Sequence, residues 1–195
     1  MAYTGAPYAL ARCYETVKQI FEAMVESPER NIAYQQAQAT ARIDLESNIA
    51  RIYQEMSGEV ATPGIVSTYL AAAEQGWNLR RIREDIANRP EVKQAIAPTL
   101  RDISGRSPTE TEEAIWIVST IEGFTLERVR YEVAHSQEAA ELINQIYREI
   151  LDRDVDPAGL TTWTDALATD WTLEAVREAI ATSEEAEAQR QEPKQ

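Results

Sequence analysis

A motif that returns at a fixed interval of 47 residues limits what this chain can fold into. It begins at Gly76-Trp77-Asn78-Leu79, returns at Gly123-Phe124-Thr125-Leu126 and returns again at Asp170-Trp171-Thr172-Leu173. Gapless copies of this length are typical of supersecondary units that bury their apolar faces against each other. The sequence therefore predicts a stack of similar units and gives no sign of a catalytic pocket.

Each copy contains three predicted helices, most clearly in the third copy. Ser136 is the predicted N-cap of the first helix. Asp156 caps the second, with Pro157 at its first position, and Thr172 caps the third. Apolar residues recur three or four positions apart in each segment, as they do on one face of an α-helix. We predict an all-α fold in which tandem three-helix repeats stack into one elongated helical domain.

The repeat frame also sets the expected boundaries. We expect an N-terminal helical hairpin or cap at 1–44, repeats at 45–91, 92–138 and 139–188, and a polar tail at 189–195. Equivalent apolar positions of the second and third helices predict a repeat core. Its members are Tyr69, Trp116, Trp163, Leu79, Leu126 and Leu173.

Composition excludes several classes of partner. The net charge is −14, which argues against generic binding to nucleic acid or to anionic lipid surfaces. Cys13 is the only cysteine, so no intrachain disulfide or thiolate metal cluster is expected. The N-terminus lacks the pattern of a signal peptide, and no apolar run approaches the ~20 residues that span a bilayer. We expect a soluble protein that is cytoplasmic, or exported or virion-borne without an N-terminal signal.

The third copy carries a more specific motif. A helix with a tyrosine is followed by Leu-x-Arg-x-x-Asp-Pro-x-Gly-Leu-x-x-Trp, then by a Thr-Leu-x-x-Val helix and Ser-x-Glu. The matching residues are Tyr147, Leu151, Arg153, Asp156, Pro157, Gly159, Leu160, Trp163, Leu173, Val176, Ser183 and Glu185. From Ser136 to Glu185 the chain thereby resembles the domain-of-unknown-function family 4214. This resemblance implies a helical interaction module of bacterial surface, secreted or virion-associated proteins, without catalytic residues.

The second copy resembles the related phycobilisome-linker domain. The resemblance rests on Ile103-Ser104-Gly105-Arg106-Ser107-Pro108, Glu112 and Gly123-Phe124. It implies a helical module of antenna assemblies.

Two groups of residues are candidates for chemistry. Asp152, Asp154 and Asp156 are spaced as at the start of a calcium loop, but Pro157 and Trp163 stand where such a loop needs Gly and Glu. Helix capping by Asp156 is the favoured interpretation, and weak calcium binding is the alternative. The single histidine, His135, falls at a predicted helix end with no sign of a nucleophile or an orienting partner.

These observations favour a non-enzymatic structural or interaction protein without a cofactor. We expect a helical repeat scaffold or linker in a virion, a cell-surface structure or an antenna-like assembly, with protein partners or self-assembly. The expected interaction loop contains Arg153, Asp156, Pro157 and Gly159. The alternative is a calcium-dependent or carbohydrate-binding module of an exported protein.

Overall fold

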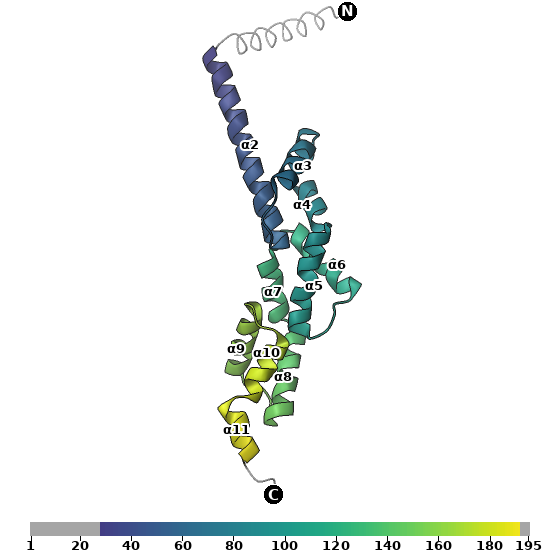
Figure 1. Ribbon diagram of the computed structural model, residues 1–195, viewed down its shortest axis with the longest axis vertical. Helices are drawn as coiled ribbons and strands as arrows, with labels where there is room; N and C mark the ends of the chain where they lie inside the picture. Colours follow the sequence, from purple (N-terminus) through teal and green to yellow (C-terminus); the bar gives the residue numbers. More distant parts are fainter. Residues whose placement is uncertain (1–27, 192–195) are drawn as a thin grey trace, which may run out of the picture. The chain divides into compact units, whose positions relative to one another are not determined.

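The computed structural model describes residues 28–191, and every regular element in that range is an α-helix (Figure 1). The predicted all-α fold is confirmed. Cys13 and the first helix of the predicted N-terminal hairpin lie outside the described residues. The helices are α2 (Pro28–Ser57), α3 (Pro63–Glu74), α4 (Leu79–Ala87), α5 (Pro90–Ser104), α6 (Glu110–Ile121), α7 (Leu126–Ala134), α8 (Gln137–Leu151), α9 (Pro157–Ala168), α10 (Leu173–Ala181) and α11 (Glu184–Gln191).

The chain forms two compact units, Met1–Asn48 and Ile49–Gln195, and α2 runs through the boundary between them. The expected boundary at residues 44 and 45 thus falls inside one continuous helix. In the first unit every side chain from 31 to 44 is exposed, including Ile32, Tyr34 and Ile43. None of the described helices is long and apolar enough to cross a membrane.

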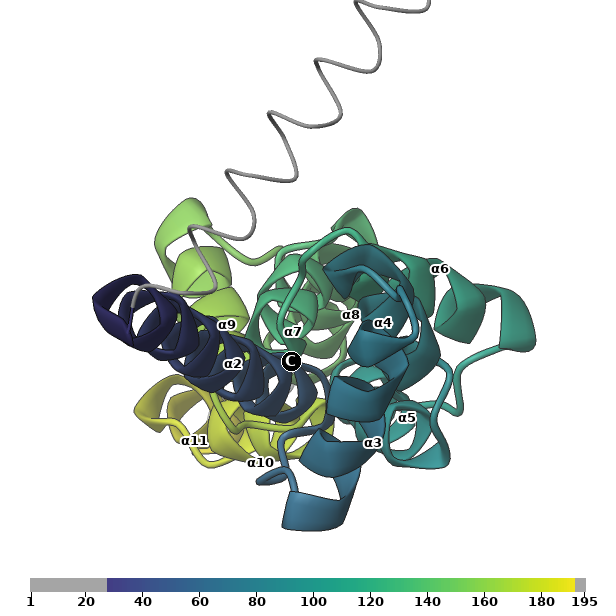
Figure 2. The same cartoon turned by 90° about the horizontal axis from the view of Figure 1, so that it is seen from above.

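The helices of the second unit keep the 47-residue register. We name the three helices of a repeat A, B and C in chain order. Helix A is the end of α2, then α5 and α8; helix B is α3, α6 and α9; helix C is α4, α7 and α10. α11 starts 47 residues after α8 and therefore takes the place of a fourth helix A. Seen from above in Figure 2, α7 lies between α8 and α9, and it packs on both.

Polar caps explain why the helices begin where they do. The predicted cap Asp156 is confirmed, and Thr62 and Thr109 cap the other B helices in the same way: each accepts a hydrogen bond from the backbone N–H three residues later. Thr109 and Glu112 also form a capping box. The predicted caps Ser136 on α8 and Thr172 on α10 are confirmed, and Asn78 and Thr125 cap the other C helices.

Helix A of every repeat ends in a left-handed residue. Gly58 has φ +75°, Gly105 has φ +68° and Asp152, at the same position, has φ +50°. A residue with a Cβ is strained in this region, and Asp tolerates it better than most. The third repeat therefore ends helix A with a residue whose left-handed backbone conformation is less favourable than that of glycine.

The predicted repeat core holds for most of its members. Tyr69 is buried, and Trp163 and Leu173 pack partly buried against the core of the third repeat. Trp116 and Leu126 are half-buried. The prediction is wrong for Leu79, whose exposed fraction is 43%.

The exposure of Leu79 follows from how successive repeats pack. A Cβ built on Gly58 would lie 3.6 Å from Leu126 Cδ2, and one built on Gly105 would lie 3.3 Å from Leu173 Cδ2. The first leucine of helix C thus faces the glycine that ends helix A of the preceding repeat. Leu79 has no such neighbour among the described residues.

Candidate functional site: the loop of the third repeat and the contacts between repeats

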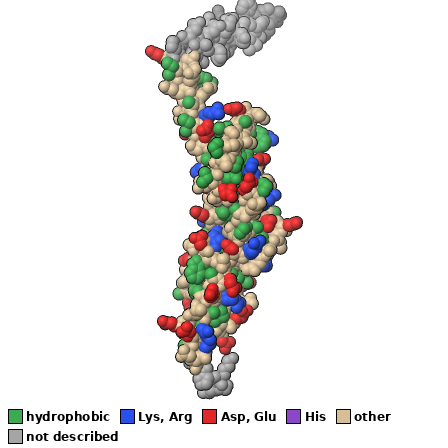
Figure 3. All heavy atoms as spheres, in the orientation of Figure 1, with side chains coloured by type: hydrophobic (Ala, Val, Ile, Leu, Met, Phe, Trp, Pro, Cys, Tyr) green, Lys and Arg blue, Asp and Glu red, His purple; other side chains and the backbone are tan. Residues whose placement is uncertain are grey.

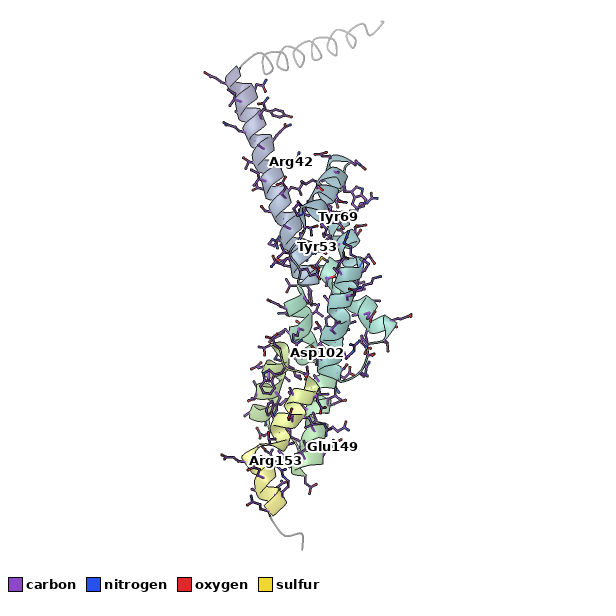
Figure 4. The ribbon with its side chains drawn as sticks, in the orientation of Figure 1. Arg42, Tyr53, Tyr69, Asp102, Glu149 and Arg153 are labelled. Atoms are coloured by element: carbon purple, nitrogen blue, oxygen red, sulfur yellow. The ribbon has the colours of Figure 1, made fainter. Side chains whose placement is uncertain are left out.

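The loop between α8 and α9 is held to α11 by a paired arginine and glutamate. Arg153 Nε donates to Glu185 Oε1 at 2.6 Å, and Arg153 Nη2 donates to Glu185 Oε2 at 2.8 Å. This two-point geometry is the strongest that an arginine and a carboxylate form. The hydrogen bonds from Arg153 lower the pKa of Glu185. Arg153 is labelled in Figure 4, beside α11.

The same loop ends at a helix cap. Asp156 Oδ1 accepts from the backbone N–H of Gly159 at 2.8 Å, and Pro157 is the first helical residue. The hydrogen bond from Gly159, and then the charge of Arg153, lower the pKa of the Asp156 carboxyl. Capping by Asp156, as predicted, uses this carboxylate to begin α9.

Tyr147 connects the loop to helix B of the third repeat. Its hydroxyl accepts from Trp163 Nε1 at 2.9 Å, and the Arg153 guanidinium lies 5.1 Å from the centre of its ring. A Cβ at Gly159 would lie 2.8 Å from the Tyr147 hydroxyl, closer than real Cβ contacts. Tyr147 thus contacts Trp163 and Arg153, and its hydroxyl leaves no room for a side chain at Gly159.

The three aspartates considered for calcium have separate roles. Asp152 ends α8 in the left-handed region. Asp154 Oδ1 accepts from Arg148 Nε at 2.5 Å and from Asn144 Nδ2 at 3.3 Å, and the bond from Arg148 lowers its pKa. Asp156 is the helix cap. Within the described part of the chain, no group of three or more histidine, cysteine or acidic side chains could hold a metal ion.

His135 joins two helices. Its Nδ1 lies 2.9 Å from the Tyr131 carbonyl oxygen, and its Nε2 lies 3.1 Å from Asp165 Oδ1 on α9. The imidazole also stacks on the Tyr131 ring, with centroids 4.1 Å apart. The Nε2 contact therefore links the end of α7 to α9, while Nδ1 bonds a carbonyl of α7 itself.

The second repeat contains the counterpart of the Arg153–Glu185 pair. Arg106 and Glu138 occupy the equivalent positions, and Arg106 Nη2 donates to Glu138 Oε1 at 2.9 Å and to Glu112 Oε1 at 2.6 Å. The hydrogen bond from Arg106 is the largest cause of the low pKa of Glu112, about 2. A loop arginine thus reaches the next helix A in two consecutive repeats.

The first repeat lacks the loop arginine, and the glutamate of the next helix A has another partner. Glu59 stands where the later repeats have arginine, and Glu91 pairs instead with Arg89 at 3.2 Å. Tyr69 of this repeat donates to Asp85 Oδ2 at 2.8 Å, and burial raises the pKa of Tyr69 to about 12.

Arginines of helix C form a second link between repeats. Arg83 Nε donates to the Thr120 carbonyl at 2.9 Å, and Arg130 Nε donates to the Leu167 carbonyl at 2.8 Å. Thr120 and Leu167 are themselves 47 residues apart, at the ends of α6 and α9. Each arginine therefore binds the negative end of helix B in the following repeat. Arg130 Nη2 adds a bond to the Trp171 carbonyl at 2.6 Å.

Sequence reasoning missed this link. The sequence pattern led to no predicted role for Arg83 or Arg130. The available signal was the recurrence of arginine at 83, 130 and 177, again 47 residues apart.

Arg177 is the third member of this series and has a different partner. Its Nη2 donates to Glu149 Oε2 at 2.5 Å, on α8 of its own repeat. No described helix stands beside α10 in the position that α6 takes beside α4 and α9 takes beside α7. The side of α10 that would contact a following helix B is thus open among the described residues.

Comparison with known proteins gives one match. No curated protein and no solved structure shows significant similarity to the chain. Residues 130–190 match the family model described as Domain of unknown function (DUF4214). The match does not reach the A and B helices of the second repeat, and the relation to phycobilisome-linker domains stays a prediction. The resemblance predicted from the motif of the third repeat is confirmed: residues 130–190, from α7 into α11, are similar to the DUF4214 family.

Proposed function

We propose that this protein is a non-enzymatic helical repeat scaffold that associates with proteins, including further copies of itself, through the ends of its repeat stack. The observation that carries the proposal is the arginine link between repeats, which is used at Arg83 and Arg130 and is left open at Arg177. A contact that joins neighbouring units within one chain can join units of different chains when one side of it stays exposed.

The first repeat offers the complementary side of this contact. Ala73, at the end of α3, is equivalent to Thr120 and Leu167. Its carbonyl accepts from Gly76 N–H at 2.9 Å. A carbonyl oxygen has two lone pairs, so this one can take a guanidinium from outside beside the Gly76 bond. Binding of Arg177 to Ala73 of a second copy would be head to tail and would continue the stack.

Charge and surface chemistry support protein partners. Acidic, basic and apolar side chains are interspersed on the face shown in Figure 3, without a large basic field. The net charge of −14 disfavours nucleic acid and anionic membranes as partners. A virion, a cell-surface structure or an antenna-like assembly would each provide the setting that we propose.

Light scattering after size exclusion tests the proposal. The mass of the wild-type protein should rise with concentration, and Arg177→Met should lower it toward the monomer. Arg128→Met is the matched control, because Arg128 is exposed and pairs with Glu132 on its own helix. A wild-type protein that stays monomeric at every concentration, with no difference from Arg177→Met, would contradict the proposal.

A further inference from the structure

The second repeat contains a cavity beside Leu100, a position at which the other two repeats have tyrosine. The cavity has a volume of about 210 Å³ and lies between α5, α6 and the junction of α7 and α8. Its apolar lining consists of Leu100, Pro108, Ile115, Trp116 and Val133.

In the third repeat, a tyrosine ring occupies the equivalent space. Leu100 is equivalent to Tyr147, and Pro108 and Trp116 are equivalent to Val155 and Trp163. Tyr147 lies against these same positions: its hydroxyl bonds Trp163 Nε1, and a Cβ at Gly159 would meet both its ring and Val155. The Tyr147 ring therefore occupies the counterpart of the cavity.

The first repeat places a tyrosine at the same position. Tyr53 is equivalent to Leu100 and is buried, with an exposed fraction of 1%. Figure 4 marks Tyr53 on α2 and its helix-B neighbour Tyr69 on α3. Leucine lacks the ring of tyrosine, so the second repeat alone leaves this space unfilled by its own helix A.

The walls of the cavity keep the groups that suit an aromatic ring. No hydrogen bond within the described residues engages the indole N–H of Trp116, whereas that of Trp163 binds a tyrosine hydroxyl. Arg106 lies at the rim, where the equivalent Arg153 stands 5.1 Å from the Tyr147 ring centre. A cation beside the face of a ring attracts it.

We infer that the second repeat binds an aromatic ring of the phenylalanine or tyrosine type between Leu100 and Trp116. The volume is sufficient, since an apolar cavity of about 150 Å³ accommodates benzene. Glu112 stands where the third repeat has Gly159, so its Cβ limits how deeply a hydroxyl can enter. Exposed Ile115, with an exposed fraction of 56%, provides apolar surface at the mouth for whatever carries the ring.

Titration of the full chain with toluene and with p-cresol tests this site. In ¹H–¹⁵N spectra the indole cross-peak of Trp116, assigned with Trp116→Phe, should shift saturably. The dissociation constant should be on the order of millimolar for a ligand this small. The indole of Trp171, which lies outside the cavity, is the internal reference. Tighter binding of p-cresol identifies a tyrosine-type ligand, and tighter binding of toluene a phenylalanine-type ligand.

Two variants test the cause of the binding. Leu100→Phe fills the cavity without adding a hydroxyl and should weaken binding at least tenfold. Tyr147→Leu recreates the cavity in the third repeat and should add a second saturable response at the Trp163 indole. No saturable shift at Trp116 with either probe would overturn the inference, as would unchanged affinity in a folded Leu100→Phe protein. Arg177→Met should leave the binding of both probes unchanged. The aromatic-ring site and the end-to-end association are therefore tested independently.

Discussion

Replacing Gly159 by alanine sets two effects of opposite sign against each other. Alanine is the better helix former, and this alone would stabilise the protein by ~0.5–1 kcal/mol. The new Cβ, however, would lie 2.8 Å from the Tyr147 hydroxyl and 3.3 Å from Val155 Cγ2. Forcing a methyl group into a packed site costs ~1–3 kcal/mol, and displacing the hydroxyl also weakens its bond from Trp163, worth ~1 kcal/mol.

The steric effect should dominate, with a net loss of ~1–3 kcal/mol in the free energy of unfolding. Urea denaturation followed by circular dichroism would show a midpoint lower by ~1 M at an unchanged slope, since slopes are ~1–3 kcal/mol per M. Gly64→Ala is the matched control. Gly64 is also in the first turn of a B helix, but a Cβ there would meet nothing closer than Thr62 Oγ1 at 3.8 Å. It should be neutral or slightly stabilising.

A second substitution identifies the responsible atom. In a Tyr147→Phe background the hydroxyl is gone, so Gly159→Ala should cost far less than it does in the wild type. The difference between the two backgrounds is the coupling energy of the pair. If Gly159→Ala and Gly64→Ala had equal effects, or if Tyr147→Phe gave no relief, the explanation of this motif glycine would be refuted.

Three further predictions concern the repeat architecture. Arg130→Met should lower the free energy of unfolding by ~2–3 kcal/mol, because its mostly buried guanidinium bonds two carbonyls; Arg128→Met should cost under ~0.5 kcal/mol in the same urea series, and equal effects would contradict the link. Asp152→Gly should raise the thermal midpoint, because it removes a side chain from the left-handed region at a position where Gly58 already stands; a lower midpoint would show that Asp152 has a stabilising partner. The folded state lowers the pKa of Glu112 to about 2, so this group stabilises the protein fully above its unfolded pKa and the contribution is lost as pH falls toward 2. Glu112→Gln should therefore flatten the decline of the urea midpoint with acid, and a decline as steep as in the wild type would contradict the assignment.

Helix positions could be predicted from the sequence because they depend on local chemistry. Thr109 with Glu112, and Asp156 with Pro157, begin helices wherever they occur. The 47-residue interval then identified which positions are equivalent.

The interval could not show which equivalent positions touch across repeats. Leu79 was placed in the core because Leu126 and Leu173 share its position, but its exposure depends on the neighbour that the preceding repeat supplies. Arg83 and Arg130 bind backbone carbonyls. Every residue has a backbone carbonyl, so the sequence does not show which one accepts. A recurring arginine therefore gave no sign of its acceptor.

The same limit applies to the candidate loop: residue spacing reveals its motif but not the contacts that the motif makes. Its motif residues were found from their spacing, but Arg153, Asp156 and Gly159 serve the packing of the third repeat in the structure. Only the geometry around Tyr147 explains why glycine stands at 159. The cavity beside Leu100 likewise required the three repeats to be compared as packed helices.

Cross-linking between two single-cysteine proteins tests the proposed end-to-end association most directly. In a Cys13→Ser background, Ala73→Cys protein is mixed with Glu174→Cys protein and treated with a short bismaleimide. Glu174 is exposed and lies one helical turn before Arg177 on α10, so this variant keeps the Arg177 guanidinium. The proposal predicts a mixed dimer that forms faster than the one obtained when Arg128→Cys protein replaces the Glu174→Cys protein. Equal, concentration-independent traces of dimer in both mixtures would contradict it.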